Sequence, residues 1–76
     1  MPHINKEGYV LIARAIGHAK EHIYRAYGNK EYAKTTPAMA SINVTVDAII
    51  TELETDNPQF DVVKFMRAID MHSGDE

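Results

Sequence analysis

The stretch that decides the fold runs from Thr36 to Glu54 and reads Thr-Pro-Ala-Met-Ala-Ser-Ile-Asn-Val-Thr-Val-Asp-Ala-Ile-Ile-Thr-Glu-Leu-Glu. Its apolar residues recur at spacings of three and four, a pattern that lays one apolar seam along an α-helix. Thr36 has the side chain of a helix N-cap, and Pro37 suits the first helical position, where its missing N–H costs nothing. We therefore predict a helix over residues 37–55. The seam consists of Met39, Ile42, Val46, Ile49 and Leu53.

Part of this stretch also fits a β-strand. Residues 41–47 alternate polar and apolar side chains, and their β-branched residues favour extended structure. A strand here needs a partner, however, and a lone two-stranded ribbon is marginal in water. The helical seam also continues on both sides of the alternating part, through Met39 and on to Leu53. We therefore favour the helix and keep the strand as the alternative.

A second amphipathic segment precedes this one. From Lys6 onward apolar residues recur at the same spacings, and Gly28 is the residue type that ends a helix in the left-handed conformation. Asn5 suits the N-cap, so we predict a helix over residues 6–27. Gly17 lies beside the seam, where its missing side chain would let another backbone approach closely. The predicted buried stripe consists of Tyr9, Ile12, Ile16, Ala19, Ile23 and Ala26, with Tyr27 beside it.

A third helix follows a break at Pro58, because the residue before a proline is pushed out of helical geometry. Asp61 can cap this helix, and Phe60 and Phe65 have the spacing of a hydrophobic staple. We predict the helix over residues 62–71, with one apolar face formed by Val62, Phe65, Met66 and Ile69, and a frayed tail over residues 72–76.

The short polar connector of residues 29–36 implies that the two long helices are antiparallel neighbours. Within this connector, residues 31–33 can add one turn of helix. The predicted fold is therefore all-α, with one domain over residues 1–76: an antiparallel helical hairpin whose open side is closed by the short third helix.

Composition limits the function classes. The 76 residues include no cysteine, so neither a disulfide nor a cysteine-based zinc site or thiol nucleophile is available. No apolar run approaches the roughly 18–20 residues that a membrane span requires. The N-terminus has no apolar signal core. We therefore expect a cytoplasmic protein.

Charge is unevenly placed along the chain. The part up to Thr36 has six cationic and three acidic residues, whereas the part from Pro37 has two cationic and eight acidic residues. Such an asymmetry orients a partner, or it reflects two solvated faces that attract each other within one small fold. Both interpretations stay open at the level of the sequence.

No set of residues has the pattern of a catalytic or cofactor site. His18 and His22 are spaced to point the same way from a helix, but the acid that a zinc-protease motif requires directly after the first histidine is missing. The glycines are too scattered to cradle a phosphate. We therefore expect no enzyme, no metal and no cofactor, and we read the two histidines as solvent-facing.

The residues that suggest binding are tyrosines and charged side chains. We expect Tyr24 to lie off the buried stripe among Lys20, His22 and Arg25, with Tyr32 in the connector; tyrosine and arginine are enriched at binding hot spots. A second candidate is an acidic face at the other end of the hairpin, formed by Glu52, Glu54, Asp56 and Asp61.

The same basic half supports an alternative function. A small nucleic-acid-binding or regulatory protein would use basic side chains of the first helix and connector together with Tyr24. The isoelectric point near 5.7 speaks against it, because phosphate binding normally shows a basic excess. The basic residues concerned are Arg14, Lys20, Arg25, Lys30 and Lys34.

Some apolar residues fall outside the seams and predict self-association. A chain this short has little of its own surface to cover them, and two-fold dimers are the commonest oligomers. We therefore predict a homodimer, in which two hairpins form a four-helix arrangement. The residues that need a second covering surface are Val10, Leu11, Val44 and Ile50.

The stretch from Leu53 to Met66 reads Leu-Glu-Thr-Asp-Asn-Pro-Gln-Phe-Asp-Val-Val-Lys-Phe-Met. It resembles the ending of many short helical accessory proteins encoded by tailed phages and prophages, which carry an Asn-Pro-x-Phe-Asp-x-x-x-Phe segment after a helix. The segment from Tyr9 to Ile16 looks like their first helix. The resemblance implies a phage accessory gene and supplies no catalytic residue. We expect a non-enzymatic protein that binds a host protein, as a host-takeover or anti-defence inhibitor.

Overall fold

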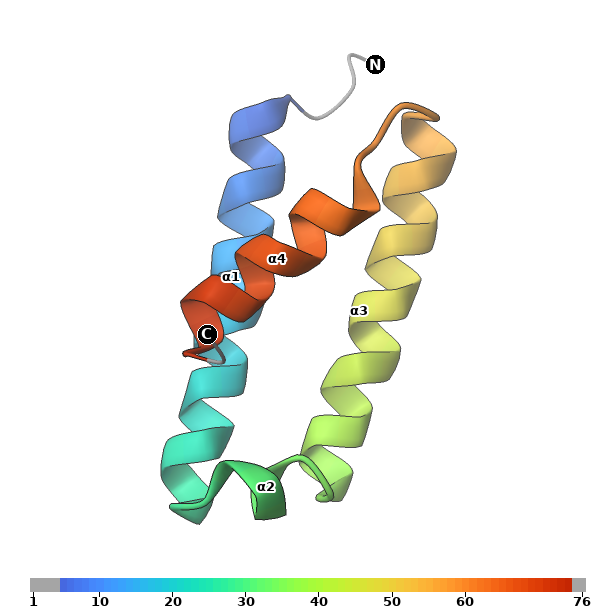
Figure 1. Cartoon of the computed structure of the whole chain (residues 1–76). Coiled ribbons are helices and arrows are strands. Elements are labelled where there is room, and N and C mark those ends of the chain that lie inside the picture. The colour runs from blue at the N-terminus through green and yellow to red at the C-terminus, as the bar shows by residue number, and fades with distance from the viewer. Residues whose placement is uncertain (1–4, 75–76) are drawn as a thin grey trace.

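In the computed structural model, which describes residues 5–74, the chain forms four α-helices and no strand within that range. They are α1 (Lys6–Tyr27), α2 (Lys30–Ala33), α3 (Pro37–Asp56) and α4 (Val62–Ser73) (Figure 1). The all-α prediction is confirmed, and residues 41–47 are helical. The extra turn expected within the connector is α2. None of these helices combines the length and the apolar character needed to cross a bilayer.

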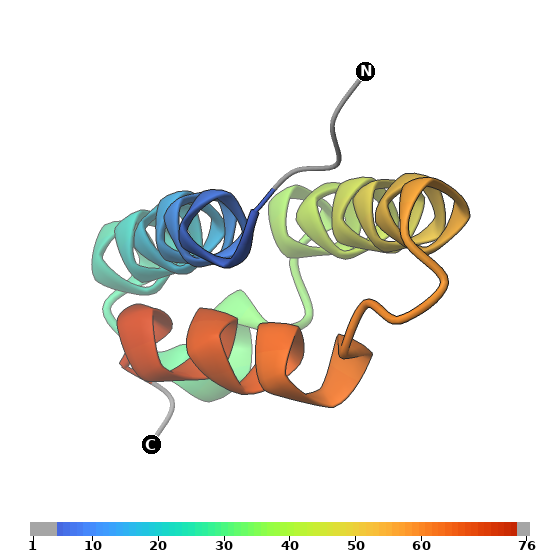
Figure 2. The same cartoon turned by 90° about the horizontal axis from the view of Figure 1, so that it is seen from above.

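The helices form two layers. The long helices α1 and α3 run antiparallel in one layer, and α4 and α2 lie in the other (Figure 2). Helix α4 crosses diagonally from the C-terminal end of α3 to the middle of α1, so it closes one side of the hairpin as predicted (Figure 1). The molecule is elongated, with extents of 41 × 19 × 18 Å.

The helix ends are set by the caps that the sequence predicts. The side chains of Asn5, Thr36 and Asp61 each accept a hydrogen bond from the backbone N–H three residues further on. Gly28 ends α1 with φ of 72°, in the left-handed region. Asn29 then caps α2 in the same way as the other three. Capping satisfies backbone groups that would otherwise lack partners at helix ends.

The most extensive contact in the fold is between α1 and α4, and it centres on Gly17. A Cβ atom at this glycine would lie 2.6 Å from the Cβ of His72 and 2.7 Å from the carbonyl oxygen of Ile69. The close approach predicted at Gly17 is therefore confirmed, with α4 as the neighbour. The main core beside this crossing is formed by Ala13, Val46, Ile50, Leu53, Phe65 and Ile69.

The predicted stripe of α1 is confirmed in part. Tyr9, Ile12, Ile16 and Ile23 are half-buried against the cores. Ala19 and Ala26 are exposed, whereas Tyr24 is buried at 6% exposure. The stripe repeats every seven residues, and on a straight helix such a pattern drifts by about 20° per heptad. Near the end of α1 the buried face therefore carries Tyr24, which packs with Ala33 of α2 and Met39 of α3.

The end of α4 also differs from the prediction. Residues 72 and 73 belong to the helix, and Ser73 is 1% exposed. The helix continues because His72 packs against the bare backbone of Gly17. Gly74 then ends it with φ of 82°. The rest of the predicted tail, residues 75–76, lies outside the described residues.

Candidate interaction surfaces

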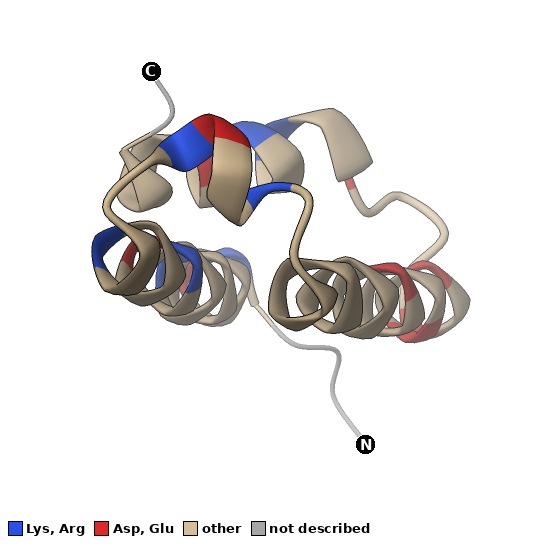
Figure 3. Ribbon diagram, turned by 90° about the horizontal axis from the view of Figure 1, so that it is seen from below, with Lys and Arg blue, Asp and Glu red and all other residues tan. Residues whose placement is uncertain are grey.

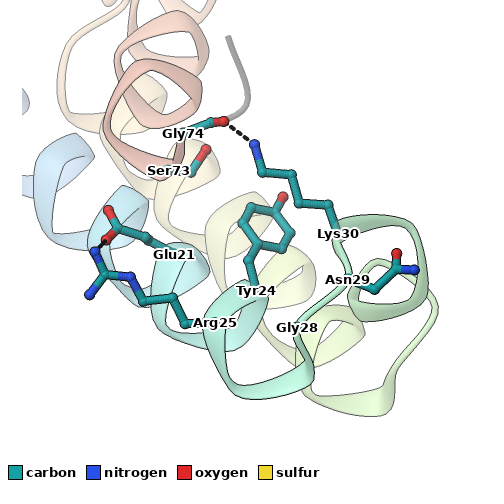
Figure 4. A pocket seen from close by; sticks show the side chains of 8 residues that line it. All are labelled: Glu21, Tyr24, Arg25, Gly28, Asn29, Lys30, Ser73 and Gly74. Atoms are coloured by element: carbon teal, nitrogen blue, oxygen red, sulfur yellow. Dashed lines mark hydrogen bonds and ion pairs between the residues drawn. The ribbon is translucent and has the colours of Figure 1, made fainter.

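The predicted basic cluster is a shallow pocket of about 410 Å³ at the closed end of the hairpin (Figure 4). The end of α1, the turn after it and the end of α4 meet there. Chain segments far apart in sequence therefore build this site, and α4 supplies one wall. The lining residues are Glu21, Tyr24, Arg25, Gly28, Asn29, Lys30, Ser73 and Gly74.

Tyr24 is part of the wall of this pocket rather than an exposed ring. It belongs to a small second core with Ala33 and Met39, so its predicted exposure is wrong. The Nζ atom of Lys30 lies 5.6 Å from the centre of the Tyr24 ring, within cation–π range. The same Nζ donates a hydrogen bond to the carbonyl oxygen of Gly74 (Figure 4). Lys30 therefore ties the start of α2 to the end of α4.

The other predicted basic residues are dispersed. Arg25 lies at the pocket but forms an ion pair with Glu21 at 2.6 Å, one turn earlier on α1. Lys20 is half-buried and does not line the pocket. The structure therefore brings Tyr24 and Arg25 together and leaves Lys20 outside.

Tyr32 has an aromatic neighbour that the sequence analysis assigned to the core. The rings of Tyr27 and Tyr32 lie edge to face, with centroids 5.5 Å apart, and both side chains are exposed. The prediction that Tyr27 is buried is therefore wrong, because α1 ends at this residue and no helix covers the ring. The exposed aromatic pair at this corner is Tyr27 with Tyr32.

The acidic residues share one end of α3 but not one face. Glu52 and Glu54 are both exposed on its last turns (Figure 3). Because they are two residues apart in a helix, their side chains point about 160° away from each other. Glu52 and Glu54 therefore do not share one face of α3, whereas Asp56 lies one turn after Glu52 on the same side of the helix. The end of α3 is acidic, and binding by its acidic residues stays a prediction. This end lies far from the basic pocket along the molecule (Figure 1).

His18 and His22 are both exposed, as predicted. The ring of His18 lies edge to face with that of His72 on α4, with centroids 5.8 Å apart. Within residues 5–74, no three His, Cys, Asp or Glu side chains are grouped closely enough to hold a metal ion.

An aromatic groove, which the sequence analysis missed, lies between the first halves of α1 and α4. It has a volume of about 460 Å³ and is closed at one end by the loop before α4. The ring of Phe60 lies 4.8 Å from that of Tyr9 and 5.3 Å from that of Phe65, which confirms the staple. Sequence spacing identifies the staple, but only the crossing of α1 and α4 brings Tyr9 to it. The groove is lined by Asn5, Lys6, Tyr9, Val10, Ala13, Asn57, Gln59, Phe60, Asp61, Lys64, Phe65 and Ala68.

Helix α4 also exposes apolar side chains on the side away from the core. Val63 and Met71 are 59% and 58% exposed, and Met66, which we predicted on the buried face, is 40% exposed. Phe65 and Ile69, predicted on the same face, are buried. We call Val63, Met66, Arg67 and Met71 the outer face of α4.

No protein-family model, curated protein or solved structure matches the chain in comparisons with known proteins.

Proposed function

We propose that this protein is a non-enzymatic factor that works by binding another protein through the outer face of α4. The observation that carries the proposal is that α4 is apolar on two sides, whereas a surface helix normally buries one apolar stripe and exposes polar residues. Its inner side packs into the core through Phe65 and Ile69. Its outer side presents three large apolar side chains to solvent.

The outer face has the composition of an interface centre. Val63, Arg67 and Met71 follow one another at spacings of four, so they form one row along the helix, with Met66 beside it. Methionine and arginine are enriched at protein interfaces, and methionine adapts its shape to a partner. An interface of standard size needs about 800 Å² per partner, which the outer face and its surroundings can supply on a molecule 41 Å long.

The partner that fits the sequence resemblance is a host protein. The resemblance of residues 53–66 to the endings of phage and prophage accessory proteins motivates a role in host takeover or in the inhibition of a defence system. Such a factor would act in the host cytoplasm. The proposal names no host protein, because the outer face defines the chemistry of an interface rather than an identity.

Protein binding is favoured over nucleic-acid binding because three residues of the predicted basic site are buried or already bonded within the chain. Tyr24 is buried and cannot stack on a base, Arg25 is paired with Glu21, and Lys30 donates to a backbone carbonyl. Nucleic-acid binding relies on cations that are available to phosphates. These three residues therefore give little support to a phosphate-binding surface.

The outer face is tested by a charge substitution with a matched control. The tagged unmodified protein should capture a stoichiometric partner from host lysate, and this partner should bind again after it is purified. The Val63→Glu variant should lose this binding. Val44→Glu is the control, since Val44 is 70% exposed on α3 and away from the outer face. The loss should be at least tenfold, as expected for a charge placed at an interface centre. Equal loss or equal retention in both variants would contradict the proposal.

We further propose that two copies associate through the open side of the α1–α3 layer. Five isoleucines of α1 and α3 are half-buried and pack against the edges of the two cores. Helices α4 and α2 cover one side of the α1–α3 layer and leave its other side open (Figure 2). Exposed Ala19 points about 160° away from Gly17, which faces α4. Ile50, which we predicted to need a second covering surface, is instead buried in the core. The five residues, which we call the isoleucine face, are Ile12, Ile16, Ile23, Ile42 and Ile49.

The accessible area agrees with association. The chain exposes 5322 Å², whereas a compact monomer of this mass exposes about 4700 Å². The radius of gyration is 13.0 Å, against about 11 Å expected for a compact domain of this length. The extra area is of the order that one partner buries in a standard interface.

Sedimentation at tens of micromolar should therefore give twice the monomer mass of 8.5 kDa. Ala19→Glu places a charge on the isoleucine face and should shift the protein to monomer. Ala40→Glu is the matched control, because exposed Ala40 is two residues from Ile42 and points about 160° away from it. A monomeric unmodified chain, or dissociation caused equally by both variants, would reject this dimer.

A further inference from the structure

The aromatic groove combines an apolar floor with cationic side chains at its edges. Phe60 and Phe65 stack in it, and Ala13 and Ala68 leave room above the floor because their side chains are small. Its volume of about 460 Å³ lies within the range of ligand-binding clefts. The groove is distinct from the outer face of α4, since no residue of that face lines it.

Three hydrogen-bond donors in this groove lack an acceptor among the described residues. Lys6 on α1 and Lys64 on α4 line it from opposite helices and form no ion pair within residues 5–74. The Tyr9 hydroxyl accepts a hydrogen bond from Nδ2 of Asn57 at 3.1 Å, which leaves its own O–H to donate. Donors that line an apolar groove are suited to a carboxylate next to an apolar side chain.

One carboxylate, that of Asp61, lines the groove against the two cations Lys6 and Lys64. Its Oδ1 accepts the backbone N–H of Lys64 at 3.0 Å as the cap of α4, and its charge offsets one of the two cations. Glu7 lies at the outer edge, on the neighbouring concave surface. The groove therefore has an excess of positive charge, although the whole chain is acidic.

The groove continues into a second concave surface of about 480 Å³ on α1. The two share Lys6 and Val10, and the second one leads on to Leu11 and Arg14. Val10 and Leu11 are 46% and 57% exposed. Together they form a track that carries the apolar side chains of Val10 and Leu11, the cations Lys6 and Arg14, and one acid, Glu7. An open track suits an extended chain better than a compact small molecule, which needs most of its surface enclosed.

We propose that the aromatic groove binds an acidic peptide segment of a partner protein. An aromatic or branched apolar side chain of the peptide fills the space between Val10 and Phe65. The carboxylates on either side of that side chain bind Lys6, Lys64 and the Tyr9 hydroxyl. The inference rests on the proposed protein-binding function, because its occupant is a segment of a partner.

The experiment is a titration of the full chain with a defined peptide, Gly-Glu-Asp-Phe-Glu-Leu-Asp-Gly, followed by ¹H–¹⁵N correlation spectra at low salt. The amide signals of Val10, Ala13, Lys64 and Ala68 should shift together as the peptide binds. A peptide with Gln and Asn in place of Glu and Asp should bind about tenfold more weakly, and Lys64→Gln should weaken binding about fivefold, as expected for one exposed ion pair. Arg67→Gln, on the same helix but outside the groove, should leave the affinity unchanged.

Each other outcome overturns the proposal. Equal binding of the acidic and neutral peptides, or shifts that map elsewhere, would exclude a carboxylate-recognising groove. Binding of 3-phenylpropionate as tight as that of the peptide would assign the groove to a small molecule. The proposals for the groove and for the outer face can be contradicted independently. Peptide binding without any captured partner would contradict only the proposal for the outer face. Capture of a partner without peptide binding would contradict only the proposal for the groove.

Discussion

The Gly17→Ala variant should melt roughly 5–15 °C below the unmodified chain, since an overpacked helix contact costs about 2–3 kcal/mol and the higher helix propensity of alanine offsets about 1 kcal/mol of that cost. The added Cβ would lie 2.6 Å from the Cβ of His72 and 2.7 Å from the carbonyl oxygen of Ile69. Neither atom is the end of a flexible side chain, so α4 itself must move. The intrinsic preference of alanine for helices, about 1 kcal/mol over glycine, acts in the opposite direction and is too small to compensate.

Gly28→Ala is the matched control for this effect. No atom lies within 4 Å of a Cβ at Gly28, and only the left-handed backbone, with φ of 72°, opposes the substitution. Its cost should be about 1 kcal/mol. Thermal unfolding followed by circular dichroism measures both variants. A Gly17→Ala variant as stable as Gly28→Ala would show that α4 does not pack closely against α1.

The Phe65→Ala variant should lose about 3–5 kcal/mol of unfolding free energy, the usual cost of removing a buried aromatic ring. Phe65 is 3% exposed and joins the main core to the staple through Phe60. A domain of 76 residues has a total stability of roughly 4–11 kcal/mol. The variant should therefore be largely unfolded, or unfold well below the denaturant concentration that the unmodified chain requires.

Val63→Ala is the control for Phe65→Ala, because it measures how much unfolding free energy is lost when an exposed side chain of α4 is shortened. Val63 is 59% exposed on the opposite side of the helix, so its truncation should change the free energy of unfolding by less than about 0.5 kcal/mol. Urea unfolding of both variants under one set of conditions provides the comparison. Equal destabilisation by the two substitutions would contradict the assignment of Phe65 to the core and Val63 to the surface.

The sequence by itself determined the helices and their ends. Caps are local, because the side chains of Asn5, Thr36 and Asp61 bond to backbone groups only three residues away. The left-handed stop at Gly28 and the staple of Phe60 and Phe65 are local for the same reason. The apolar seam of α3 could also be predicted from the sequence, since the spacing of its apolar residues follows the helical period.

Which sides of α1 and α4 are covered depends on tertiary contacts. Tyr24 is buried because it packs with Ala33 of α2 and Met39 of α3. The diagonal path of α4 across α1 buries Ser73 at the end of α4 and leaves Met66 exposed. The aromatic groove has the same origin, because Tyr9 and Phe60 are distant in sequence and meet only at this crossing. The apolar patterns of α1 and α4 each fit more than one buried face. The choice between them depends on the angle at which the two backbones meet, and Gly17 permits that close approach.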